Sequence, residues 1–122
     1  MDELINISDL RRKLERFASE RDWNQFHNPK NISMALSVET SELLEIFQWV
    51  DGNASREESF LHKNKEAISD EIADVFLYLL RLSTLCGVNF EKSIKNKMIK
   101  NEQKYPAELV KGSSKKYTEY KK

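Results

Sequence analysis

Two apolar segments that carry regularly spaced carboxylates decide the fold: VETSELLEIF at residues 38–47 and ISDEIADVFL at residues 68–77. Each segment holds an acidic pair three positions apart, Glu39 with Glu42 and Glu71 with Asp74. Residues with this spacing lie one turn from each other on the same helix face. Apolar residues at helical spacing flank the first member of each pair. We therefore predict two helices that each direct a carboxylate toward the core.

Buried carboxylates require compensation, because an unpaired charge is costly away from water. A bound cation meets that requirement. Four oxygen donors without a cysteine or histidine at ligand spacing suit Mg²⁺, or Mn²⁺, better than zinc. The sequence thus predicts a metal site formed by Glu39, Glu42, Glu71 and Asp74. In the alternative interpretation, these carboxylates pair with lysines and arginines of neighbouring helices or face water.

The length, charge balance and apolar content of the chain indicate what kind of protein it is. A chain of 122 residues is the size of one domain with a single core. Its 20 acidic and 20 basic residues balance, which gives no overall field to attract nucleic acid or an anionic membrane. The first residues lack the basic and apolar regions of a signal sequence, and no apolar stretch is long enough to span a membrane. We expect a cytoplasmic protein whose lone cysteine, Cys86, packs without a disulfide.

Periodicity and capping signals predict an all-α bundle of four to five helices. The first is expected over residues 8–20 with Ser8 as N-cap, and the second over residues 31–50. A capping box from Ser55 to Glu58 is expected to begin a third helix that runs to about residue 85, with a possible break between residues 62 and 66. The fourth is expected over residues 90–104.

The C-terminal part of the sequence divides into a helix and a tail. Ile94 and Met98 are expected to face inward from the last helix. Residues 1–110 are predicted to form the helical domain, and the lysine-rich residues 111–122 a disordered tail. Because the two central helices are apolar on several faces, we also predict a homo-oligomer.

Motifs in a fixed order carry a resemblance to a known family. They are RDW with FH at residues 21–27, ExxELxExFQW at residues 39–49, DEIADV with a later tyrosine from residue 70 to residue 78, and KMxKNxxKYP at residues 97–106. This set resembles the MazG-like nucleoside triphosphate pyrophosphohydrolases, and among them the dCTP pyrophosphatases. The likeness covers about residues 8–107.

The resemblance implies an all-α dimer or dimer of dimers that uses Mg²⁺ to cleave a nucleoside triphosphate, with dCTP favoured, to a monophosphate and pyrophosphate. The carboxylates that match the family's metal ligands are Glu39, Glu42, Glu71 and Asp74. The residues that match its phosphate side are Lys97, Asn101 and Tyr105, and those that match its base and sugar side are Trp23, His27, Trp49 and Tyr78. Two departures, Arg81 and the lysine-rich tail, bear on substrate choice.

Cleavage requires a water molecule in line with the bond that breaks and positive charge over the phosphate oxygens. Glu39 or Glu42 is our hypothesis for the base that activates this water, with Glu45 as the alternative. Lys97, Lys100 and Asn101 share a helix face that can neutralise pyrophosphate, although such a face is also typical of solvated lysines. The aromatic residues suit base stacking, although aromatics on helices are commonly core.

A second class of function stays open at this point. A non-enzymatic helical module that binds a partner protein needs no metal, and it predicts basic partners for the inward carboxylates. Neither hypothesis includes nucleic acid or a membrane as partner.

Overall fold

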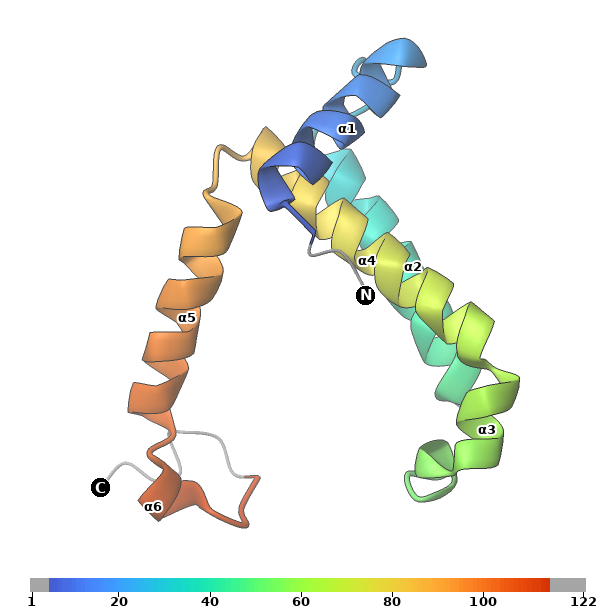
Figure 1. Ribbon diagram of the computed structural model, residues 1–122, viewed down its shortest axis with the longest axis vertical. Helices are drawn as coiled ribbons and strands as arrows, with labels where there is room; N and C mark the ends of the chain where they lie inside the picture. The colour runs from blue at the N-terminus through green and yellow to red at the C-terminus, as the bar shows by residue number, and fades with distance from the viewer. Residues whose placement is uncertain (1–4, 115–122) are drawn as a thin grey trace. The chain divides into compact units, whose positions relative to one another are not determined.

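The computed structural model describes residues 5–114, and this part of the chain is helical with no strand (Figure 1). Residues 5–114 contain six α-helices and one short 3₁₀ helix, against the four to five helices predicted. They fall into two compact units, one ending at Gly87 and one beginning at Val88.

The first helix, α1 (Ile7–Glu20), begins earlier than predicted. Its N-cap is Asn6, whose Oδ1 accepts a hydrogen bond from the Asp9 backbone N–H at 3.0 Å. The prediction of Ser8 as N-cap is wrong, because the asparagine two residues earlier already satisfies the free N–H and Ser8 lies inside the helix.

Asn6 and Ser8 provide a test of this cap. Asn6→Ala is expected to lower the free energy of unfolding by about 1 kcal/mol, the usual cost of losing an N-cap side chain. Ser8→Ala is the matched control and is expected to cost less, because alanine is the better helix former inside the first turn. Chemical denaturation of both variants measures the difference, and a larger loss for Ser8→Ala would contradict this cap.

A short link joins α1 to α2 (Pro29–Phe47). At its start the N–H groups of Asp22 and Trp23 donate to the carbonyls of Ser19 and Ala18, at 3.1 and 2.9 Å. Asp22 has a φ of 54°, so α1 ends in the left-handed turn that glycine usually provides. At the end of the link Asn28 caps α2, so the helix begins before the predicted residue 31. Its last residue, Phe47, also comes before the predicted end at residue 50.

The third predicted helix is divided into three pieces: η1 (Ala54–Arg56), α3 (Glu58–Lys63) and α4 (Lys65–Leu85). The predicted capping box is wrong, because Ser55 lies within η1 and its Oγ donates to the Gly52 carbonyl at 2.6 Å. The predicted break is confirmed at Asn64. Gly87 follows the end of α4 with a φ of 66°, the left-handed conformation that commonly ends a helix.

The core of the first unit lies along α4. Helices α2 and α4 run antiparallel and side by side, and α1 packs against α4 (Figure 1). Ala18 of α1, Ile32 of α2 and Leu80 of α4 are buried. At the far end of the pair, the rings of Phe47 and Phe60 lie 5.8 Å apart, so α3 closes the turn between α2 and α4.

The second unit contains α5 (Phe90–Lys104), with the bounds predicted, and α6 (Ala107–Val110), which the sequence analysis did not predict. Ile94 and Met98 were expected to face inward, yet they are 50% and 59% exposed in the single chain. The structure describes the predicted tail only up to residue 114, with a turn at residues 111–112, and residues 115–122 lie outside the described part.

The structure also bears on the packing of Cys86 and on the prediction that no segment spans a membrane. Cys86 was expected to pack but is exposed, because it caps the last turn of α4. Within the described part of the chain, none of the helices has the length and apolarity that a membrane span requires.

Candidate active site

The carboxylates of Glu39, Glu42 and Glu71 meet between α2 and α4. One oxygen of each lies within 4.8 Å of the chosen oxygens of the other two. Helical spacing brings Glu39 and Glu42 onto one face of α2, and the antiparallel partner helix brings Glu71 opposite them. We call these three residues the carboxylate cluster. Its arrangement agrees with the inward direction predicted for Glu39 and Glu71, whereas Asp74, the second member of the pair on α4, is not part of it.

Two oxygens of the carboxylate cluster are buried without a hydrogen-bond donor, Oε2 of Glu39 and Oε2 of Glu71. Burial and the charge of Glu42 raise the pKa of Glu39 to about 7. The pKa of Glu71 is also raised, mainly by burial. The rest of each side chain is partly exposed. Solvent therefore reaches the cluster, while one carboxylate oxygen of α2 and one of α4 are shielded from it.

Two ionised carboxylates cannot hydrogen-bond to each other, because both are acceptors only. When Glu39 carries a proton, it can donate to Glu71, and this bond raises the pKa of Glu39 while lowering that of Glu71. The ion pairs found within residues 5–114, Arg12 with Asp9 and Arg21 with Glu20, do not involve the cluster. Hard oxygen donors with shielded, unpartnered atoms fit a divalent cation.

Asp74 and Tyr78 lie beside the cluster on α4. The charge of Asp74 contributes to the raised pKa values of Glu39 and Glu71, although Asp74 is not one of the three residues whose oxygens meet. Burial, and then the charges of Glu39 and Asp74, raise the pKa of Tyr78. Glu45, the alternative base, is exposed one turn further along α2.

A pocket of about 460 Å³ opens next to Asp74. It is formed by α1, the link and α4, and four of the predicted site residues line it: Trp23, His27, Asp74 and Tyr78. The remaining lining residues are Leu10, Lys13, Leu14, Phe17, Leu77 and Arg81. The pocket is apolar with a few polar groups, which is the usual character of a small-molecule site.

The link holds its aromatic side chains in fixed positions. The Trp23 ring meets Phe17 edge-on at 5.6 Å and lies 6.3 Å from the His27 ring. The backbone N–H of His27 donates to the carbonyl of Trp23 at 3.1 Å, and the Asn31 side chain donates to that of Phe26 at 2.9 Å. These bonds, one of them from the first turn of α2, hold Trp23 and His27 at the pocket.

Arg81 joins the link to α4. Its Nε donates to Nδ1 of His27 at 3.2 Å, and its Nη2 donates to Oδ1 of Asn24 at 2.9 Å. Sequence reasoning noted Arg81 only as a departure from a family pattern and missed Asn24. One signal was present, since a single cation inside the apolar run LYLLRLSTL (residues 77–85) requires a polar partner.

The structure does not bring the other predicted residues to this pocket within the first unit. Trp49 follows the end of α2, is 89% exposed and lines neither of the two pockets described here. Lys97 and Asn101 lie exposed on α5, and Tyr105 caps the end of that helix with its N–H on the Asn101 carbonyl. These three belong to the second unit.

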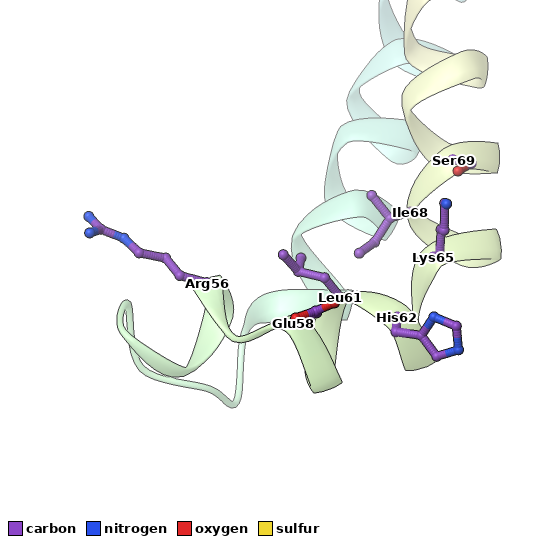
Figure 2. Close-up of a pocket in the computed structure, with 7 residues that line it drawn as sticks. All are labelled: Arg56, Glu58, Leu61, His62, Lys65, Ile68 and Ser69. Atoms are coloured by element: carbon purple, nitrogen blue, oxygen red, sulfur yellow. The ribbon is translucent and has the colours of Figure 1, made fainter.

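A second pocket, of about 440 Å³, lies where η1 and α3 meet the start of α4 (Figure 2). Figure 2 shows that Arg56 extends away from the other lining residues. The full lining is Arg56, Glu58, Leu61, His62, Lys65, Ile68 and Ser69. None of these is a predicted site residue, so we assign the candidate active site to the carboxylate cluster and the pocket beside Asp74.

Comparison with known proteins gives concordant matches. A model of the MazG-like family matches residues 34–120. Human dCTP pyrophosphatase 1 is 40% identical over 113 residues, which cover 93% of this chain and 66% of the human protein. The bovine dCTP pyrophosphatase 1 is 37% identical over 113 residues, which cover 93% of this chain and 67% of the bovine protein.

A solved structure agrees with these sequence matches. The crystal structure of a pyrophosphatase from Archaeoglobus fulgidus DSM 4304 superposes with a TM-score of 0.77 at 39% identity, covering 87% of this chain and 97% of that one. The family model spans well over half of the sequence, including both acidic pairs. The chain therefore belongs to the MazG-like family.

Proposed function

We propose that this protein is a divalent-metal-dependent nucleoside triphosphate pyrophosphohydrolase, which converts a dNTP to the dNMP and pyrophosphate and so clears the nucleotide pool. One observation carries the proposal: a cluster of three carboxylates with shielded, unpartnered oxygens lies beside an aromatic-lined pocket. The preference for dCTP rests on the mammalian relatives, which are named dCTP pyrophosphatases.

The alternative, a helical module without enzymatic activity, requires basic partners for the inward carboxylates. In the part of the chain that the structure describes, no lysine or arginine lies within ion-pair distance of Glu39, Glu42 or Glu71. Uncompensated negative charge at this position favours a cation site over a docking surface.

Glu39, Glu42 and Glu71 would hold the metal, with Asp74 as a fourth ligand, and Mg²⁺ is the proposed ion with Mn²⁺ as the alternative. When bound, the ion supplies positive charge over the phosphate oxygens. Glu39 or Glu42 accepts a proton from a water molecule that attacks the α-phosphorus, and the bond to the bridging oxygen then breaks to release pyrophosphate. Glu45 is the less favourable base, because it lies outside the cluster.

The nucleoside is proposed to occupy the pocket lined by Trp23, His27 and Tyr78, where the aromatic rings stack on the base. Lys97, Asn101 and Tyr105 of α5 are proposed to contact the phosphates, and Trp49 the base. Exposed apolar side chains on three helices support a homodimer or homotetramer that buries them: Val38, Leu44, Ile72, Leu79, Ile94 and Met98.

The test combines metal titration with a substrate panel. Adding Mg²⁺ to the metal-free protein is expected to raise its thermal unfolding temperature, because the folded state alone presents the assembled carboxylates. Pyrophosphate release is then measured across the canonical and modified dNTPs, with the fastest release expected from dCTP. No thermal shift together with no release from any dNTP would refute the proposal.

A further inference from the structure

Arg81 is a buried cation whose partners are unusual. It is 8% exposed, yet within residues 5–114 no carboxylate lies within ion-pair distance of it. A guanidinium stays charged at any physiological pH, so burial without a counter-ion has to be offset by hydrogen bonds. The bonds that the structure contains run to two neutral groups of the link, Nδ1 of His27 and Oδ1 of Asn24.

These bonds determine the chemical form of both partners. Arginine has donors only, so Nδ1 of His27 must be the acceptor and the ring proton must sit on Nε2. Burial, and then the charge of Arg81, lower the pKa of His27, which favours the neutral ring. Asn24 is fixed in the same way, because its carbonyl oxygen faces Arg81 and its NH₂ group is turned away.

We propose that Arg81 is a positioning residue of the nucleotide site, which holds His27 as the Nε2–H tautomer and so presents a hydrogen-bond donor to an acceptor on the pyrimidine edge. Arg81 and His27 line the same pocket as Trp23 and Tyr78. In cytosine, the O2 carbonyl and the ring nitrogen N3 are adjacent acceptors, so a fixed donor suits that edge. The role toward substrate rests on the proposed function, whereas the tautomer is a property of the protein alone.

The first experiment measures the tautomer by ¹⁵N NMR of histidine-labelled protein. The sequence has only two histidines, so a His62→Gln variant assigns the signals of His27. At neutral pH the wild-type protein is expected to show the Nε2–H form of His27. Arg81→Met, which keeps length without charge or donors, is expected to give a mixture of tautomers and to return the pKa of His27 toward its ordinary value.

Two further variants make the result decisive. Arg16→Met removes an exposed arginine of α1 and is expected to leave the His27 signals unchanged. Arg81→Lys keeps the charge but lacks the Nε donor, and it is expected to release the tautomer even if Arg81→Met does not fold. A wild-type His27 that carries its proton on Nδ1, or a tautomer that neither Arg81 variant changes, would overturn the proposal.

The second experiment separates positioning from chemistry. With dCTP, Arg81→Met is expected to raise KM about 2- to 12-fold, the range for loss of a hydrogen bond between neutral groups, and to leave kcat within about twofold. An equal fall in kcat and kcat/KM with KM unchanged would show a transition-state role and contradict positioning. If the wild-type protein cleaved no dNTP, the proposed function would fail while the NMR result still decided the tautomer.

Discussion

Replacing Glu39 with glutamine is expected to lower metal-dependent pyrophosphate release about 10²- to 10³-fold, the range seen when one preorganised electrostatic group is removed from an active site. The same change is expected to stabilise the metal-free protein. Both effects have one cause, because Glu39 carries negative charge into a cluster that already contains Glu42 and Glu71. Glutamine keeps the shape of the side chain but removes its share of the repulsion and of the metal site.

The pH dependence of stability provides a separate measure of this repulsion. In the folded metal-free protein the pKa of Glu39 is raised from 4.5 to about 7. Between these values the folded state binds more protons than the unfolded state, so its stability falls as the pH rises. Thermal unfolding in the presence of a chelator is expected to show this fall for the wild-type protein and a smaller one for Glu39→Gln.

Glu66→Gln is the matched control for Glu39→Gln. It removes one charge from an exposed position in the first turn of α4, and activity and the response to Mg²⁺ are expected to persist. If Glu39→Gln kept full activity and the normal Mg²⁺ shift, Glu39 would be neither a ligand nor the base. If its metal-free stability also fell, the repulsion described above would be absent.

Leu80→Ala is expected to lower the free energy of unfolding by about 2 to 5 kcal/mol, the range for deleting a fully buried leucine side chain. Leu80 is 0% exposed and lies on α4, the helix that packs against both α1 and α2. Its carbonyl accepts the hydroxyls of Ser83 and Thr84, and the substitution leaves these backbone contacts in place. The expected loss therefore reports side-chain packing alone.

Leu61→Ala is the control for Leu80→Ala, since Leu61 of α3 is 39% exposed and is not among the apolar side chains proposed to be buried between subunits. Its expected cost is within about 1 kcal/mol, because a side chain that already contacts solvent leaves little cavity. Urea denaturation of both variants gives the comparison. Equal losses would contradict the assignment of Leu80 to the core of the first unit.

The carboxylate cluster was predictable from sequence because helical periodicity fixes which residues share a face. Glu39 and Glu42 lie on one turn of α2, and their apolar neighbours indicated that this turn packs against another helix. Helix ends were less predictable, since several polar residues compete for each N-cap. Asn6 and not Ser8 is the N-cap of α1, and Ser55 lies inside the 3₁₀ helix η1 and does not cap a helix.

The pocket could be predicted only in part. Trp23 and His27 were recognisable as candidates by resemblance, but no periodicity operates in a link, so its path depends on particular hydrogen bonds. The bond between Arg81 and His27 joins residues 54 positions apart, and it becomes visible only when α4 is placed against the link. The sequence alone showed that Arg81 is a cation within an apolar run, but it did not show that His27 is its partner.

The link between α1 and α2 has a fixed length because both of its ends are closed. The left-handed residue Asp22 terminates one helix, and the Asn28 side chain, with Pro29 in the first turn, starts the next. Inserting or deleting a single residue between them would shift His27 out of reach of Arg81. Homologues that use this arrangement should thus keep the residues that correspond to Trp23, Asn24 and His27 and hardly vary in the number of residues in the segment, whereas its other positions are free to change.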